Sequence, residues 1–401
     1  MKITYSENGT DESKLTIVLE GKISSDNAPS AEETLCQMIE GISDRKLVLD
    51  LNHLTYISSA GLRVLLFIKK KYNIRISLIN VHPEIAEILH ITGMTEIFEM
   101  NWYMRECSIE GCKKLGQGAS GEVFILQDDA IIKVFHSNIP LETIERERNL
   151  SRSALIAGIP TAIPFETVRV GESCYGNVYE KVGTKTLSET IMDEPERSDE
   201  LLRKYAQLYR QIHETPVDSR AFPRAKEIFH GYIDGCRDWY KDDELSSMHK
   251  LVDGFPERDL LIHGDYHTRN VMVHGNELVL IDLGDMSVGH PVFDFVASAM
   301  TQATLLDNEP ATTEIFVGMK GEYIAKGWDM LLEESFPDRT EKERESIDRM
   351  LRRLARIKIG CMPVVASGVP EDMLHRCVED AKQTLLPCID ELVGMVGALD
   401  W

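Results

Sequence analysis

The chain has 401 residues and the composition of an ordinary globular protein, with 43% hydrophobic and 27% charged residues. Its formal net charge of −22 is uneven: residues 1–105 hold 11 Lys+Arg and 14 Asp+Glu, leaving 33 of the 44 Lys+Arg and 52 of the 66 Asp+Glu to the rest. This acidity argues against partners such as nucleic acid or an anionic membrane surface, and it would tolerate a cationic small substrate.

The length of the chain and its cysteines further limit the kinds of protein that this sequence can encode. The length predicts two to three domains, and no apolar run approaches the ~20 residues that span a bilayer. The N-terminus lacks the pattern of a signal peptide. The eight cysteines contain no Cys-x-x-Cys pair, and Cys107 and Cys112 have no matching second pair, so neither a disulfide scaffold nor a zinc site is expected. We therefore expect a cytoplasmic protein with reduced cysteines.

Residues 1–105 alternate strand and helix patterns and predict a small α/β domain with helices packed on a sheet. The expected strands and helices are, in chain order, strand 14–21, helix 27–42, strand 46–51, helix 61–72, strand 74–79 and helix 83–91.

From residue 106 the pattern changes to short strands joined by Gly-rich or Asp-Asp turns. Five strands are expected at 113–115, 122–127, 130–135, 165–170 and 177–180, with a charged helix at 141–157 between the third and the fourth. From about residue 187 the chain is mostly helical, interrupted by a strand hairpin within 262–285. A β-rich lobe (106–182) followed by a helical lobe (183–401) predicts a bilobal kinase-like domain over 106–401.

Gly116, Gly118 and Gly121 form a G-x-G-x-x-G pattern followed by a strand. A strand, rather than a helix, favours a hairpin lid over phosphates and argues against a dinucleotide-binding fold. Glycines let backbone N–H groups approach phosphate oxygens closely. The alternative is a flexible β-turn.

Lys133 lies inside an apolar strand, where a solvated face explains it poorly. We expect it to contact phosphate, and such a lysine needs a carboxylate to position it. The helix at 141–157 offers Glu147 as the first choice and Glu145 as the alternative.

The stretch His263–Asn270 and the segment ending at Asp282 carry the strongest signal. Two strands in a hairpin between them would bring Asp265, Asn270 and Asp282 to the same edge. There one carboxylate can orient a hydroxyl group while the other carboxylate and the amide oxygen hold Mg²⁺.

With Gly289-His290-Pro291-Val292-Phe293-Asp294, these motifs resemble the aminoglycoside phosphotransferase and choline kinase family over roughly residues 110–395. The resemblance implies that ATP and Mg²⁺ are the cofactors. It makes Asp265 the catalytic base, Asn270 and Asp282 the metal ligands, Lys133 the α/β-phosphate lysine and the three glycines the lid. Asp294 is similar to a structural aspartate of the family, and the segment 179–182 to the connection between lobes, whose backbone at Glu180 and Val182 would hold adenine. His267 is expected to hydrogen-bond within its loop, and His263 and His290 to be structural.

Residues 50–62 resemble the STAS domain of anti-sigma factor antagonists, a likeness that spans about 1–102. The resemblance implies docking of a protein partner or self-association, and it makes Ser59 a candidate phosphoacceptor at a helix N-terminus. The acidic residue common before this serine is Ser58 here. The alternative is a Ser-Ser helix cap without regulation.

Three functions are compatible with these motifs: a small-molecule kinase, a Ser/Thr protein kinase in a partner-switching circuit, and a nucleotide sensor. Only eight residues separate Asp282 from Pro291, which leaves no room for a long activation segment, and Gly264 replaces the arginine that would hold one. The sequence keeps all of Lys133, Asp265, Asn270 and Asp282, which argues against a nucleotide sensor that has lost catalytic activity. We therefore expect a phosphotransferase with an alcohol group as acceptor. The residues that contact the acceptor are expected within 200–250 and 340–375. Among them, Glu227, Asp234 and Asp238 could contact a cationic acceptor.

Overall fold

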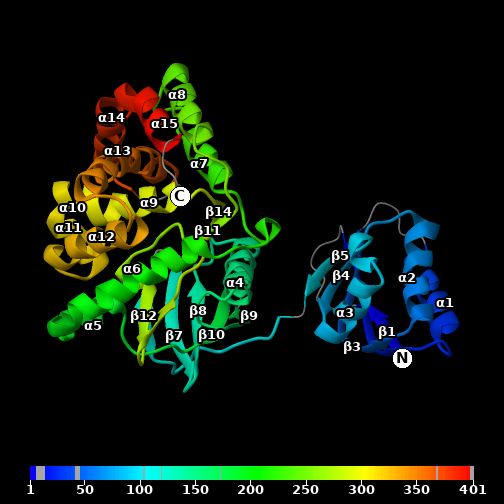
Figure 1. The fold of residues 1–401 in the computed structure, drawn as a ribbon. Helices are drawn as coiled ribbons and strands as arrows, with labels where there is room; N and C mark the ends of the chain where they lie inside the picture. Colours follow the sequence, from blue (N-terminus) through cyan, green and yellow to red (C-terminus); the bar gives the residue numbers. More distant parts are fainter. Residues whose placement is uncertain are drawn as a thin grey trace. The chain divides into compact units, whose positions relative to one another are not determined.

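The structure is a computed structural model that describes residues 1–5, 14–40, 46–102, 104–118, 120–171, 173–366 and 369–397 (Figure 1). The chain divides into two compact units, Met1–Cys107 and Ser108–Trp401. Each unit has a hydrophobic core of its own. No helix in the described ranges is long and apolar enough to cross a membrane.

The first unit is a five-stranded sheet in the order β1-β2-β3-β4-β5, antiparallel between β1 and β2 and parallel elsewhere. Helices alternate with the parallel strands, so the predicted small α/β domain is confirmed. Its elements are β1 (Lys2–Tyr5), β2 (Lys14–Ile23), α1 (Ala28–Ile39), β3 (Lys46–Ile57), α2 (Ser59–Tyr72), β4 (Ile76–Val81), α3 (Pro83–Ile91) and β5 (Glu99–Trp102). The expected end of the first helix, Ile42, lies outside the described residues.

Helix α2 begins two residues earlier than the sequence pattern indicates. The Ser58 side chain accepts a hydrogen bond from the Gly61 backbone N–H at 3.3 Å and caps the helix. A Cβ at Gly61 would lie 2.7 Å from Ile23 Cγ2 and 2.8 Å from Ile57 Cγ1, so only glycine lets α2 pack this close to the sheet. This cap leaves Ser59 exposed as the first residue of the helix.

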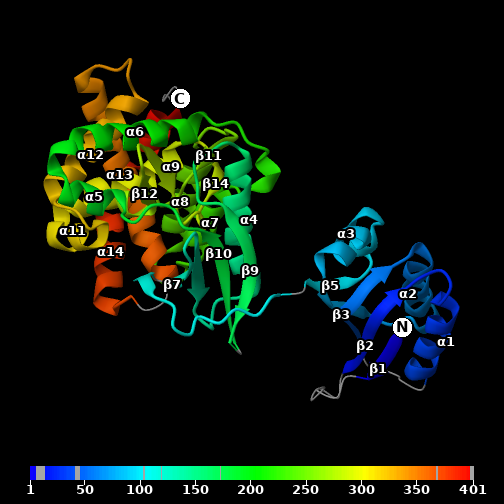
Figure 2. The same ribbon diagram turned by 90° about the horizontal axis from the view of Figure 1, so that it is seen from below.

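The second unit begins with an antiparallel sheet in the order β6-β7-β8-β10-β9, and helix α4 packs on β9 and β10 (Figure 2). Its elements are β6 (Lys114–Gln117), β7 (Gly121–Gln127), β8 (Ala130–Phe135), α4 (Leu141–Ile156), β9 (Pro164–Val170) and β10 (Cys174–Glu180). The predicted β-rich lobe is confirmed.

The rest of the second unit is helical around a large core and includes two small strand pairs, β11 with β14 and β12 with β13. The predicted helical lobe and its hairpin are confirmed. The elements are α5 (Leu187–Asp193), α6 (Ser198–Glu214), α7 (Ala225–Asp234), α8 (Asp242–Asp253), β11 (Leu260–Ile262), β12 (Val271–His274), β13 (Glu277–Leu280), β14 (Ser287–Gly289), α9 (Val292–Ala299), α10 (Leu305–Asn308), α11 (Pro310–Val317), α12 (Gly321–Ser335), α13 (Glu341–Val365), α14 (Glu371–Thr384) and α15 (Ile389–Gly397).

The hairpin β12–β13 carries two of the predicted site residues at its open end. Val271 pairs with Leu280, and the Ile281 backbone N–H donates to the Asn270 carbonyl at 2.9 Å, so Asn270 and Asp282 leave the hairpin side by side. Leu280 also ties the hairpin to the segment between α4 and β9, because its N–H donates to the Pro160 carbonyl at 2.8 Å and its carbonyl accepts the Thr161 hydroxyl at 3.1 Å.

Candidate active site

Lys133 joins the two lobes of the second unit. Its Nζ lies 2.9 and 3.1 Å from the Glu147 carboxylate oxygens on α4, and 2.9 Å from Asp282 Oδ1 after β13. The lysine and Glu147 side chains are only 15% and 11% exposed, whereas Asp282 remains 52% exposed. Burial lowers the pKa of Lys133, but the charges of Asp282 and Glu147 outweigh it and hold the pKa above its usual value. The ammonium is therefore charged and points at the open end of the hairpin.

Asp265 lies on the loop after β11 with its carboxylate oriented by two neighbours. Asn270 Nδ2 donates to Asp265 Oδ2 at 3.2 Å and to the Asp265 carbonyl at 3.0 Å, and His267 Nε2 lies 3.4 Å from the same Oδ2. Burial would raise the pKa of Asp265, but the contact with His267 and the charge of Lys358 hold it well below its usual range. The carboxylate is ionised and still 34% exposed, so it could accept a proton from a bound hydroxyl group.

A fully buried carboxylate fixes the start of this loop. Asp294 on α9 accepts the backbone N–H groups of His263 and Gly264, each at 2.9 Å, and lies 2.9 Å from His213 Nε2 on α6. Gly264 has φ +84, and a Cβ there would lie 2.5 Å from the Asp285 carbonyl. The turn before Asp265 thus depends on one glycine and one buried acid.

The other side of the same loop is anchored in the core. The Tyr266 hydroxyl donates to the Tyr205 carbonyl at 2.7 Å, and Gln302 Nε2 donates to the Tyr266 carbonyl at 2.9 Å. The two tyrosine rings stack with centroids 4.5 Å apart. Asp265 is therefore held between a rigid turn and a packed aromatic side chain.

The side chains of Asn270 and Asp282 fit a hard divalent cation. Because Asn270 Nδ2 faces Asp265, the amide oxygen is the atom left for another partner. Asp282 has φ 58, a left-handed conformation that non-glycine residues seldom adopt, and only its Oδ1 bonds to Lys133. An amide oxygen and a carboxylate oxygen from one hairpin end are donors that Mg²⁺ accepts.

The three glycines of the β6–β7 turn differ in what surrounds them. The Gly118 N–H donates to the Gly121 carbonyl at 2.9 Å and closes the turn. A Cβ on Gly121 would lie 2.1 Å from the Val134 carbonyl, so this glycine is required by strand packing. A Cβ on Gly116 or Gly118 would meet no described atom within 4 Å, so their backbones are open to a partner on that side.

The two residues of the lobe connection lie at the end of β10. The Glu180 backbone N–H donates to the Ile163 carbonyl at 2.9 Å, and its carboxylate accepts the Ile163 N–H at 3.2 Å. Val182 is 8% exposed and lies two residues after Glu180. The last predicted site residue, Ser59, belongs to the first unit and is not part of this site.

His263 and His290 each form a hydrogen bond within their own loop. His263 Nδ1 accepts the Asp265 N–H at 3.3 Å, and His290 Nδ1 accepts the Val292 N–H at 3.1 Å. Burial lowers the pKa of both imidazoles, that of His290 to about 4. Neutral rings of this kind stabilise turns.

Two residues that contact the site were missed in the sequence. Lys358 on α13 is 7% exposed and donates to the Gly264 carbonyl at 2.7 Å, and His213 is the buried partner of Asp294. Lys358 stands between Ile357 and Ile359, and a lysine between apolar residues is the same signal that Lys133 carries. His213 carries no local signal, because its partner lies 81 residues away.

Comparisons with known proteins agree with this division of the chain. Residues 111–331 match the family described as the phosphotransferase enzyme family, and residues 5–106 match the STAS domain. The "Putative anti-sigma factor antagonist BtrV" of Bordetella bronchiseptica is 37% identical over 87 residues, which cover 21% of this chain and 74% of that protein.

Two solved structures are also similar to the chain. The ADP-bound aminoglycoside phosphotransferase APH(2'')-Ib has 16% identity and a TM-score of 0.48, covering 69% of this chain and 94% of its own. A choline/ethanolamine kinase family protein from Mesorhizobium loti has 14% identity and a TM-score of 0.46, covering 71% and 92%. Scores this low add nothing to the family match.

Proposed function

We propose that this chain, which belongs to the phosphotransferase enzyme family, transfers the γ-phosphoryl group of ATP to a hydroxyl group of a small molecule. The observation that carries the proposal is Lys133, whose single ammonium holds Glu147 of one lobe and Asp282 of the other. A lysine ion-paired in this way is the part of a kinase site that receives the nucleotide phosphates.

Each of the other site residues has a separate role in the transfer. Asp265 orients the acceptor hydroxyl and takes its proton as the oxygen attacks the γ-phosphorus, while the bond from that phosphorus to the β-phosphate oxygen breaks and ADP leaves. Asn270 and Asp282 would hold Mg²⁺, which neutralises charge on the phosphates when bound. Gly116, Gly118 and Gly121 cover the phosphates, and the backbone at Glu180 and Val182 holds the adenine.

A substrate screen with coupled detection of ADP tests this function. The panel should contain aminoglycosides, choline, ethanolamine, homoserine and methylthioribose, because each presents a hydroxyl in a different chemical setting. Acceptor-dependent ADP formation above the rate of ATP hydrolysis alone is the expected result. Magnesium-dependent nucleotide binding without transfer to any acceptor would contradict it.

We further propose that the STAS domain docks a protein partner or a second copy of the chain. Ser59 is exposed in the first turn of α2, where a phosphate would meet free backbone N–H groups and the positive end of the helix dipole. Ser58, not Ser59, supplies the cap, so phosphorylation of Ser59 would leave the cap in place.

If the STAS domain controls the kinase domain within one chain, the fragment 106–401 is expected to differ from the full chain in initial rate or in acceptor KM. Each unit has its own core, so the fragment is expected to fold when it is expressed alone. Equal rates and equal KM values in the two proteins would restrict the STAS domain to binding partners.

A further inference from the structure

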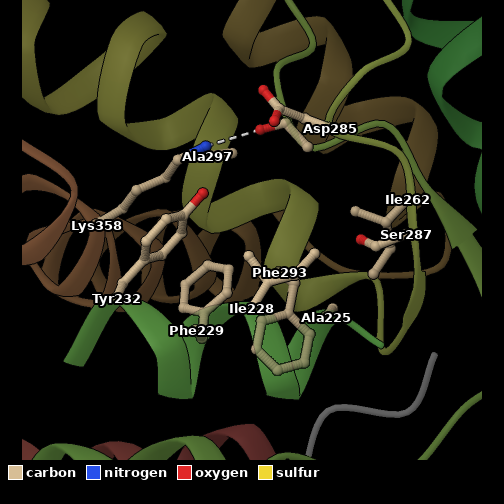
Figure 3. A pocket seen from close by; sticks show the side chains of 11 residues that line it. Ala225, Ile228, Phe229, Tyr232, Ile262, Asp285, Ser287, Phe293, Ala297 and Lys358 are labelled. Atoms are coloured by element: carbon tan, nitrogen blue, oxygen red, sulfur yellow. Dashed lines mark hydrogen bonds between the residues drawn. The ribbon is translucent and has the colours of Figure 1, made fainter. Parts of the chain in front are cut away.

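Two carboxylates of the candidate site, Asp265 and Glu147, are supported from behind by different side chains. In the helical lobe, Lys358 of α13 donates to the Gly264 carbonyl at 2.7 Å, just before Asp265, and the dashed line in Figure 3 marks this bond. In the strand lobe, Glu147 belongs to α4, so the position of that helix decides whether its carboxylate reaches Lys133. The contacts that hold α4 therefore set the geometry of the lysine pair.

Asn177 is a buried side chain that faces α4 from the sheet. In the register of the sheet, Asn177 on β10 pairs with Lys133 on β8 and with Thr167 on β9. Side chains of directly opposite residues lie on the same face of an antiparallel pair, so these three form one row across the sheet. Helix α4 packs on β9 and β10, and Lys133 bonds to Glu147 of that helix. The row therefore lies on the face that α4 covers.

Both polar atoms of the Asn177 side chain form hydrogen bonds at this face. Its Oδ1 accepts the Thr167 hydroxyl at 2.7 Å, and its Nδ2 donates to the Ile144 carbonyl of α4 at 2.9 Å. A carbonyl can only accept, so the amide has one possible orientation. Asn177 is 0% exposed, which makes these bonds costly to lose. Ile144 lies three residues before Glu147, nearly one helical turn, so the bond fixes α4 next to the carboxylate.

Tyr179 links the same row to the Glu147 carboxylate. Its hydroxyl accepts a hydrogen bond from Asn177 Nδ2 at 3.4 Å and donates to Glu147 Oε1 at 3.4 Å. Burial raises the pKa of Tyr179, so the hydroxyl stays a donor. Both contacts are long, and the bond from Asn177 to the helix is therefore the stronger support.

We propose that Asn177 is a positioning residue that fixes α4, and with it Glu147, against Lys133, and that Tyr179 assists by orienting the carboxylate. The Lys–Glu pair is then in place before a nucleotide or a partner binds. In protein kinases, movement of the helix that bears the glutamate controls this pair. In this chain, control by the STAS domain or by a partner must act on another element. The inference rests on the proposed phosphotransferase function and concerns the regulation of its site.

The competing explanation is that Asn177 only supports the fold of the strand lobe. ADP and adenosine separate the two explanations, because ADP presents phosphates to Lys133 and adenosine presents none. A loosened lobe would weaken the binding of both ligands. A displaced Glu147 would weaken the binding of ADP and leave that of adenosine in place.

Asn177→Leu roughly keeps the size of the side chain and removes its hydrogen bonds. We expect the Kd of ADP with Mg²⁺, measured by calorimetry on the full chain, to rise by roughly tenfold, the size of one hydrogen bond to a charged group. The Kd of adenosine should stay at the wild-type value. An equal rise for both ligands, or no rise for ADP, would overturn the inference.

Glu147→Gln completes a double-mutant cycle with Asn177→Leu. Glutamine keeps the shape of the side chain and removes the charge that pairs with Lys133. If Asn177 acts through Glu147, Asn177→Leu should add little to the loss of ADP binding that Glu147→Gln causes alone. Losses that multiply in the double variant would show that Asn177 acts independently and would refute the proposed role.

Trp328→Phe is the control for lost stability. Trp328 is 1% exposed, and its Nε1 donates to Asp348 at 2.7 Å within the helical lobe, so the variant loses a buried hydrogen bond away from α4. Its affinity for ADP should equal that of the wild type.

Tyr179→Phe takes the place of Asn177→Leu if the latter is too unstable to purify, because it removes only a hydroxyl group. We expect a rise of roughly threefold in the Kd of ADP and none in that of adenosine. Wild-type affinity for ADP in this variant would then count against the inference.

Nucleotide binding needs no acceptor, so the two proposals can be judged separately. Weaker ADP binding in Asn177→Leu, with adenosine binding intact and without transfer to any acceptor in the screen, would support the positioning role and contradict the phosphotransferase function. Transfer to an acceptor, together with unchanged ADP binding in Asn177→Leu, would do the reverse.

Discussion

Replacing Asp265 with asparagine is expected to lower kcat by roughly 10²- to 10⁴-fold, the usual contribution of a general base. The substitution keeps the shape of the side chain but removes the charge and the oxygen that receives the proton. The hydrogen bond from Asn270 to the Asp265 carbonyl at 3.0 Å does not depend on the side chain, so the loop should keep its course.

Nucleotide binding is expected to survive this change, because Lys133 and Glu147 do not contact Asp265. Acceptor-dependent ADP formation and nucleotide affinity, measured on the same preparation, check both halves of the prediction. Asp238→Asn is a matched control, since Asp238 is an exposed aspartate outside the site. A kcat within threefold of the wild-type value would refute the assignment of Asp265 as the base.

Asp294→Ala should give the largest loss of stability among the substitutions considered for this site. The carboxylate is fully buried and serves three donors, the backbone N–H groups of His263 and Gly264 and the His213 ring, each at 2.9 Å. Removing one member of a buried polar pair costs about 3–5 kcal/mol in the free energy of unfolding. Urea denaturation of the full chain measures it, and Asp390→Ala, at an 86% exposed side chain, should change it by less than about 0.5 kcal/mol.

The contribution of Asp294 also depends on pH with a defined sign. Burial would raise the pKa of Asp294, but the hydrogen bonds from His213 and the His263 backbone hold it below its usual value. A folded-state pKa below the unfolded one means that the stabilisation is complete above about pH 4 and is lost as pH falls through the folded-state pKa. The difference in unfolding free energy between wild type and Asp294→Ala should therefore shrink in acid. A difference that grows as pH falls would contradict this account.

Local patterns are enough to predict most of the fold and the residues that meet in the candidate site. Lys133 is predictable because a lysine inside an apolar strand is rare, and Asn270 and Asp282 because a short hairpin must bring its two ends together. The edge strands β1 and β5 were missed, since four-residue strands give too little alternation to recognise.

Contacts over long sequence distances explain what could not be predicted. Lys358 meets the Gly264 carbonyl 94 residues away, and His213 meets Asp294 across 81 residues. Neither separation leaves a periodic or motif signal, because the packing of whole helices decides which side chains arrive at the loop.

The hydrogen bonds on Leu280 have a consequence for the rigidity of the second unit. They fasten the hairpin that bears Asn270 and Asp282 to the segment leading into β9, so this hairpin is anchored to the strand lobe as well as to the helical lobe. We therefore expect the two side chains to keep their mutual spacing when other segments of the unit move.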